Sequence, residues 1–247
     1  MAERAKGKSG TELERPVAEQ VDALLGWLER TGTKRGRESM ARYAIPSDKA
    51  FGVPVGVLQK KAKEVGRHHE LALALWKVDR YEARMLAAFM DDPARVTPAQ
   101  MDRWCREFDS WAICDTVCLH LFDRTPHAWD KVALWSRRRD EFVRRAAFAL
   151  IAGLALHDRR SGDAPFLRSL SLVERAAGDE RNFVKKAVNW ALRAVGGRNP
   201  ALHQAAVAAA GRLAKSDDPS ARWIGKDALR QLASPATRKR LEARARV

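Results

Sequence analysis

Two stretches of the chain, Phe142-Val-Arg-Arg-Ala-Ala-Phe-Ala149 and Phe183-Val-Lys-Lys-Ala-Val-Asn-Trp190, decide the fold because they repeat one pattern. Each begins with an aromatic residue, carries a cation at its fourth position and continues mainly with apolar residues. The pattern aligns without gaps at three further places, which begin at Tyr81, Trp111 and Trp223. Residues three, four and seven positions apart share one helical face, so all five segments are predicted to be helical.

The spacing of these segments predicts a repeat protein. Their starts are separated by 30, 31, 41 and 40 residues, which suits two-helix units that bury their faces against their neighbours. Turn and cap signals lie between the helical stretches, for example Thr97-Pro98, Gly196 to Pro200 and Asp217-Asp218-Pro219. We therefore predict an all-α fold, a superhelical array of HEAT-like two-helix repeats that forms a C-shaped solenoid with a basic concave face. An irregular helical bundle is the alternative.

The N-terminus differs in composition from the rest of the chain. Residues 1–15 are polar and charged, contain two glycines and lack the apolar segment of a signal peptide, so we predict a disordered basic leader. Residues 16–247 are predicted to form a single HEAT-like-repeat domain. No stretch is long and apolar enough for a membrane span, which predicts a protein without membrane contact.

The charge balance points to a phosphate-rich partner. Among 247 residues, 46 Lys and Arg stand against 31 Asp and Glu, a net charge of +15. Each phosphate that a cation neutralises releases condensed counterions, which favours binding to nucleic acid. A protein that is basic without such a partner is the other interpretation.

Three cysteines lie close together at Cys105, Cys114 and Cys118. Their odd number argues against a disulfide framework and favours a reducing cytosol, so we expect a cytoplasmic protein, nucleoid-associated when bound to DNA. Their spacing lacks the paired Cys-x-x-Cys pattern of structural zinc sites. Small buried side chains are the favoured interpretation, and we predict neither a metal nor a cofactor.

The helical face that carries the cations also carries three residues of another kind. The fourth positions of the five segments are occupied by Arg84, Cys114, Arg145, Lys186 and Lys226. Equivalent positions of stacked repeats line one surface, so the four cations predict a phosphate-tracking groove. Trp111, Asp115 and Trp190 lie on this face too, directed at whatever the cations hold. In the alternative, the two indoles are core aromatics and Asp115 pairs with a neighbour such as Arg145.

These residues resemble a known family. The stretches Met40-Ala-Arg-Tyr43, Trp111-Ala-Ile-Cys-Asp115, Phe142 to Phe148 and Phe183 to Trp190 are similar to the AlkD-like DNA alkylation repair family, whose HEAT-like-repeat glycosylases remove N3- and N7-alkylated purines from DNA. The resemblance implies catalytic roles for Trp111, Asp115 and Trp190 and a phosphate contact for Arg145. It departs at Ala112, where family members often have an acid.

The resemblance implies a monofunctional N-glycosylase that acts on double-stranded DNA as a monomer. An alkylpurine with a formal positive charge is already a good leaving group, so one carboxylate suffices to stabilise the oxocarbenium-like sugar and orient water. A non-catalytic DNA-binding protein of the same fold and a protein-binding HEAT scaffold are the alternatives.

Overall fold

The computed structural model describes residues 15–245, and every regular element between Val17 and Ala245 is helical. The predicted leader lies outside the described residues except for Arg15. Backbone packing divides the chain into two compact units, one up to Val96 and one from Thr97 onward. The all-helical prediction is confirmed, whereas the single domain stays a prediction. None of the described helices is long and apolar enough to cross a bilayer.

The first unit contains five described helices, which are α2 (Val17–Thr31), α3 (Lys34–Ala41), α4 (Val55–Val65), α5 (His69–Lys77) and α6 (Tyr81–Met90). Helix α5 packs on α2 and α6, and α6 also packs on α4. The connection before α4 is fixed by Glu82, whose buried carboxylate accepts hydrogen bonds from the backbone N–H groups of Phe51, Gly52 and Val53 at 2.9, 2.6 and 3.1 Å. Gly52 has a φ of +84° there, a conformation that favours glycine.

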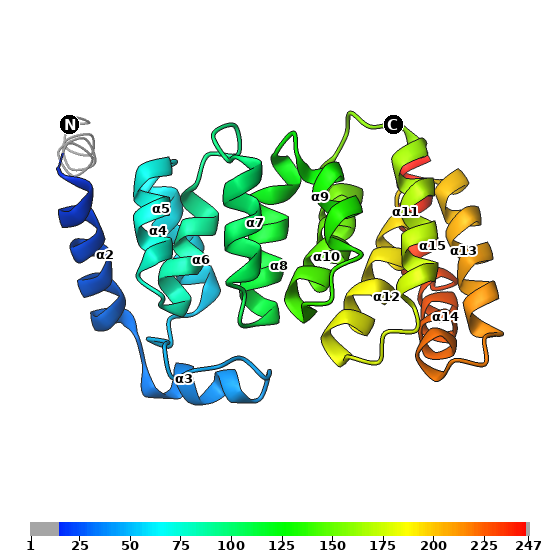
Figure 1. Cartoon of the computed structure of the whole chain (residues 1–247), viewed down its shortest axis with the longest axis horizontal. Helices are drawn as coiled ribbons and strands as arrows, with labels where there is room; N and C mark the ends of the chain where they lie inside the picture. Colours follow the sequence, from blue (N-terminus) through cyan, green and yellow to red (C-terminus); the bar gives the residue numbers. More distant parts are fainter. Residues whose placement is uncertain (1–14, 246–247) are drawn as a thin grey trace. The chain divides into compact units, whose positions relative to one another are not determined.

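The second unit continues in chain order from green to red in Figure 1. Its helices are α7 (Pro98–Arg106), α8 (Trp111–His120), η1 (Phe122–Arg124), α9 (Ala128–Trp135), α10 (Glu141–His157), α11 (Asp163–Ala176), α12 (Asn182–Gly196), α13 (Pro200–Ala214), α14 (Pro219–Leu232) and α15 (Pro235–Ala245). Several predicted caps are confirmed, since Thr97, Asn199 and Asp218 each accept a hydrogen bond from the first turn of a helix that begins with proline.

Helices α8, α10, α12 and α14 carry the four repeated segments of this unit, and each packs on the next. They run parallel. The thiols of Cys114 and Cys118 point to the carbonyls of Phe142 and Ala146, so successive turns of α8 face successive turns of α10. Helices α9, α11 and α13 pack against α10, α12 and α14 respectively, which is the two-helix repeat that the sequence predicts.

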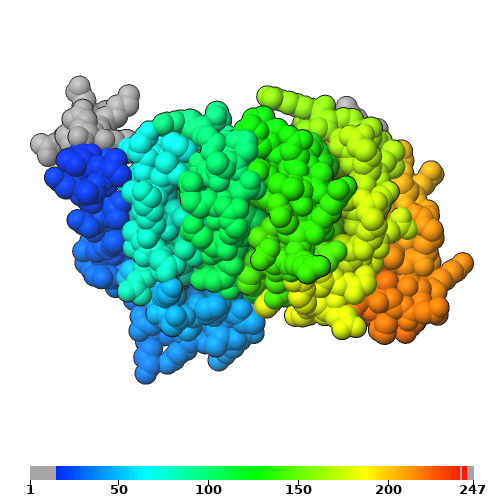
Figure 2. Space-filling view, in the orientation of Figure 1, coloured from blue at the N-terminus to red at the C-terminus, as the bar shows by residue number. Residues whose placement is uncertain are grey.

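The core of this unit is built mainly from small and branched apolar side chains. Helix α10 is buried along almost its whole length, because it lies between α8, α9, α11 and α12. The green, yellow and orange segments of the space-filling view belong to this series of packed helices (Figure 2). This row of parallel helices therefore carries all the predicted site residues except Arg84.

Candidate functional site

Asp115 and Arg145 form the centre of the candidate site. Asp115 lies in the second turn of α8 and Arg145 in the second turn of α10. The guanidinium Nε and Nη2 donate to the two carboxylate oxygens at 2.9 and 2.7 Å, and Nη1 donates to the carbonyl of Phe183 on α12 at 2.6 Å. One guanidinium thus connects three neighbouring helices. Such a two-point ion pair is the strongest arrangement that an arginine and a carboxylate form.

Both charged side chains of this pair are largely removed from water. The Asp115 side chain is 18% exposed and that of Arg145 is 7% exposed. Burial raises the pKa of Asp115 above its ordinary value, and the hydrogen bonds and charge of Arg145 oppose that rise. Burial alone would lower the pKa of Arg145, but Asp115 more than offsets this and raises it. The pKa of Asp115 therefore stays above its ordinary value, and Arg145 is the group that favours the ionised carboxylate.

The contact between Asp115 and Arg145 is the alternative that the sequence left open. It does not exclude a role in binding, because a guanidinium has five N–H donors and the described residues use three of them. One N–H on Nη1 and one on Nη2 remain for an anion. A phosphate contact through these two N–H groups stays a prediction, since the Arg145 side chain is only 7% exposed.

Trp111 begins α8, one turn before Asp115, and is half-buried. The Ser110 hydroxyl accepts a hydrogen bond from the N–H of Ile113 at 3.3 Å and fixes the start of the helix. Ala112, where the resemblance leads one to expect an acid, is buried. An acid at this position would need a partner inside the protein.

Trp190 lies further along the helices, in a cleft of about 360 Å³ between α10 and α12. Small residues form most of its walls, together with Leu156 and Arg193. Neither Asp115 nor Trp111 is among the described residues that line it. Trp190 is two turns beyond Phe183, which corresponds to about 10 Å along the helix from the level of the ion pair. The described residues therefore do not bring Trp190 into one cleft with Trp111 and Asp115.

The four predicted phosphate-binding cations differ in exposure and in their ion pairs. Lys186 and Lys226 are exposed and form no ion pair with described residues. Arg145 is paired as above. Arg84, in the first unit, is buried, forms an ion pair with Asp79 at 2.9 Å and lies over the ring of Trp76 at 5.0 Å. A phosphate contact stays a prediction for all four cations.

Sequence reasoning missed several contacts of this region. Asn189 donates to Asp227 at 2.7 Å and thereby ties α12 to α14. The rings of Phe142 and Phe183 are 5.6 Å apart, and Lys185 lies 5.4 Å from the ring of Trp223. The aromatic first positions of the repeats were visible in the sequence, but the axial offset between neighbouring helices, which decides their partners, was not.

The three cysteines are buried, as predicted. Cys114 and Cys118 lie on α8, on either side of Asp115 in the sequence, with their thiols directed at carbonyls of α10. Burial raises the pKa of the Cys105 and Cys118 thiols well above the ordinary value. Such thiols act as small apolar packing groups.

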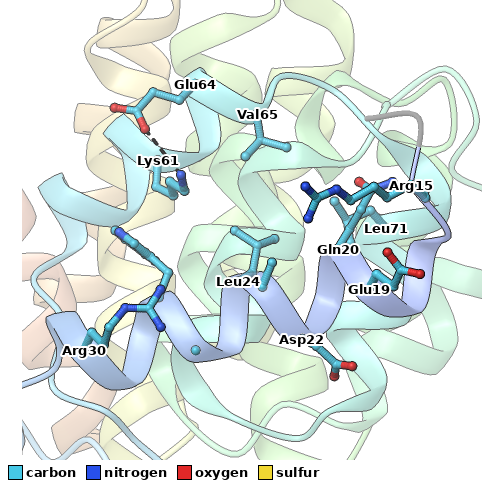
Figure 3. Close-up of a pocket in the computed structure, with 13 residues that line it drawn as sticks. Arg15, Glu19, Gln20, Asp22, Leu24, Arg30, Lys61, Glu64, Val65 and Leu71 are labelled. Carbon is cyan, nitrogen blue, oxygen red and sulfur yellow. Dashed lines mark hydrogen bonds and ion pairs between the residues drawn. The ribbon is translucent and has the colours of Figure 1, made fainter. Parts of the chain in front are cut away.

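A larger cleft, of about 420 Å³, lies in the first unit between α2, α4 and α5 (Figure 3). Leu24, Val65 and Leu71 line it beside side chains of both charge signs, including the ion pair of Lys61 with Glu64. None of the predicted site residues lies there. Size alone therefore does not select it as the functional site.

The sequence of this helical chain matches a known protein family. Residues 25–232 match the model of a family described as DNA alkylation repair enzyme. The chain belongs to this DNA alkylation repair family. No curated protein matches the chain significantly.

Among solved structures, the DNA alkylation repair fold of this chain is similar to one described as "a new family of proteins related to the HEAT-like repeat DNA glycosylases with affinity for branched DNA structures". The TM-score is 0.72 at 22% identity, over 90% of this chain and 95% of that one. This likeness shows a HEAT-like repeat fold. A designed armadillo repeat protein is also similar, with a TM-score of 0.38 at 15% identity over 90% of this chain and 97% of that one.

Proposed function

We propose that the protein is a DNA glycosylase that excises positively charged N3- and N7-alkylated purines. The observation that carries this proposal is the buried Asp115–Arg145 ion pair on packed helices α8 and α10, one turn beyond Trp111. Family membership supports a role in alkylation repair. The net charge of +15 supports binding to the DNA backbone.

The reaction needs one carboxylate because the leaving group is already cationic. The bond between the purine nitrogen and C1′ of the deoxyribose breaks, and its electron pair neutralises the departing base. Positive charge develops on the sugar, where ionised Asp115 stabilises it and orients a water molecule for attack on C1′. The proton of that water passes to the carboxylate and then to solvent. An abasic site and a neutral alkylpurine are the products.

The size of this electrostatic effect is appropriate for catalysis. Two opposite unit charges about 4 Å apart at an effective dielectric constant of about 20 attract each other by about 4 kcal/mol. A barrier lowered by that amount corresponds to roughly a thousandfold in rate. Trp111 and Trp190 would add contacts of their ring faces with the cationic nucleotide.

Arg145 would position the substrate through its two unused N–H groups. A phosphate that accepts from them competes with Asp115 for the guanidinium charge, which leaves the carboxylate freer to face the sugar. Lys186 and Lys226 would contact the backbone further along the helix row, without reading sequence. DNA binding and activation of Asp115 are then coupled through one side chain.

A second function is favoured by a specific observation. Both oxygens of Asp115 accept hydrogen bonds from Arg145, and Ala112 departs from the family pattern. A non-catalytic member would keep this pair for stability alone and bind DNA by charge. The protein described as having affinity for branched DNA is a precedent within this fold.

Excision of 7-methylguanine from duplex DNA tests the choice between these functions. Wild-type protein is expected to release free 7-methylguanine faster than spontaneous depurination, whereas Asp115→Asn loses most of this activity and still binds DNA, since Asn keeps the size but not the charge. Release by the wild type at only the spontaneous rate would contradict the enzyme. If Asp115→Asn loses DNA binding and excision to the same extent, the role of Asp115 is to stabilise the structure and not to act in the reaction.

Asp102→Asn is a matched control for removal of a paired carboxylate. Asp102 on α7 accepts from Lys131 at 2.7 Å and from the Trp135 indole at 2.9 Å, so its removal also breaks a charged contact in the same unit. Because it lies on another helix, Asp102→Asn is expected to retain excision. Thermal unfolding of both variants separates an effect on stability from an effect on chemistry.

A further inference from the structure

The surface where α12 meets α14 carries an aromatic side chain that the proposed excision does not use. Trp223 on α14 is 42% exposed, an unusual exposure for an indole. Lys185 on α12 lies 5.4 Å from the centre of its ring. The two helices lie side by side, α12 in yellow and α14 in deep orange (Figure 1). An exposed aromatic ring and a cation thus occur together on one face.

Further cations continue this face. Lys226 is one turn beyond Trp223 on α14, and Lys186 follows Lys185 on α12. Both Lys186 and Lys226 are exposed and form no ion pair with described residues. Asp227, the nearest acid along α14, is occupied by Asn189 and Arg230. The charge around the ring is therefore positive and available to an anion.

The position of this face is fixed by neighbouring contacts. Asn189 and Asp227 join α12 and α14 at 2.7 Å, and Lys185 and Trp223 stand one turn earlier on the same two helices. Gly225 brings α14 so close to α13 that an added Cβ would lie 2.2 Å from the N atom of Ala214. Trp223 thus projects from a helix that is held on two sides.

We propose that Trp223, with Lys185, Lys186 and Lys226, is a stacking site for an unpaired DNA base and its flanking phosphates. Single-stranded DNA sites use such an exposed indole as a π-face for a base, and the Lys185 ammonium that lies over the ring would move from it to a flanking phosphate, where Lys186 and Lys226 also neutralise charge. A base inside an intact duplex is stacked on its neighbours and does not reach this ring. The site therefore selects DNA with unpaired bases, at a fork or a single-stranded arm. It rests on the proposed DNA binding and is independent of the excision step.

Fluorescence anisotropy with labelled DNA tests this site. Wild-type protein is expected to bind a forked duplex with single-stranded arms more tightly than the same sequence fully paired. Trp223→Leu is expected to weaken fork binding by about tenfold, a typical cost of losing one base stack. Affinity for the paired duplex should stay nearly unchanged, and Trp223→Phe should restore part of the preference because it returns an aromatic face.

Leu167→Ser is the control, since Leu167 is an exposed apolar residue of α11 with 45% exposure. It should leave the preference unchanged. Wild-type protein without fork preference, or a Trp223→Leu variant that keeps it, would overturn the stacking site.

Excision of 7-methylguanine from paired duplex, measured on the same samples, separates the two proposals. If the protein excises 7-methylguanine but does not prefer the fork, only the proposed stacking site is contradicted. If it prefers the fork but does not excise, only the proposed glycosylase activity is contradicted.

Discussion

At the scale of single residues, the contact between Asp115 and Arg145 sets the charge on which the proposed chemistry depends. Burial favours the neutral acid and the guanidinium favours the carboxylate. Because these two effects oppose each other at Asp115, we expect the excision rate to change even with a substitution of Arg145 that keeps the positive charge.

Arg145→Lys is expected to move the acid side of the pH–rate profile to higher pH. Lysine keeps the charge but cannot reproduce the two-point contact, so the pKa of Asp115 rises further above its ordinary value. The carboxylate is then protonated, and excision stops, at a higher pH than in the wild type. Single-turnover excision rates measured against pH at saturating protein check this, after subtraction of spontaneous depurination. An unchanged acid limb would mean that Arg145 does not control the charge of Asp115.

The sequence named Arg145 as a partner of Asp115 only as one of two alternatives, and helical periodicity could not choose between them. Helical spacing correctly placed Trp111 and Asp115 on one helix, one turn apart. It aligned the fourth positions of all repeated segments, whereas Asp115, at the fifth position of its segment, contacts Arg145, at the fourth position of the next segment. Periodicity gives the face of a helix, but the axial offset between neighbours depends on packing between helices that are distant in sequence.

At the scale of helices, close packing between α13 and α14 rests on one small residue. A Cβ at Gly225 would lie 2.2 Å from the N atom of Ala214 and 2.6 Å from the carbonyl oxygen of Ala210. Both are backbone atoms, which cannot turn away as a side chain can. The helices must separate to accept any larger residue.

Gly225→Ala is expected to lower the free energy of unfolding by about 1–3 kcal/mol, the usual cost of overpacking. Gly211→Ala is the matched control on α13, because a Cβ there meets no atom within 4 Å. That change should stabilise the protein by about 0.5–1 kcal/mol through helix propensity. Thermal unfolding of the two variants measures the difference, and equal midpoints would contradict the close approach.

The helices themselves were largely predictable. The segments beginning at Tyr81 and Trp111 start helices α6 and α8 at those residues, and the other three lie within α10, α12 and α14. Proline-containing caps at Thr97, Asn199 and Asp218 marked three helix starts correctly. Local signals of this kind need no knowledge of the partners. The close approach of α13 and α14 at Gly225 was not predictable in this way. A glycine within a helical pattern does not by itself indicate that a neighbouring helix lies close to it.

At the scale of the whole molecule, the excess of positive charge governs the proposed affinity for DNA. With +15 net charge, binding to undamaged duplex is expected to weaken steeply as salt is added. The Lys186→Gln, Lys226→Gln double variant should reduce the slope of log K against log salt by about 2, because each phosphate that a lysine neutralises adds about 0.9 to it. Titrations at several salt concentrations measure this. A slope unchanged by the double variant would remove these lysines from the interface.

The parallel direction of α8, α10, α12 and α14 has an electrostatic consequence of its own. Aligned peptide dipoles give each helix roughly half a positive elementary charge at its N-terminus, so four such ends add their potentials. The first turns of α8 and α12 contain no acidic residue, whereas Asp140 and Glu141 lie at the start of α10 and α14 is capped by Asp218, so the positive ends of α8 and α12 are the less compensated ones. The backbone at these helix starts is therefore expected to contribute to the proposed binding of phosphate, and this contribution should persist when every lysine nearby has been neutralised.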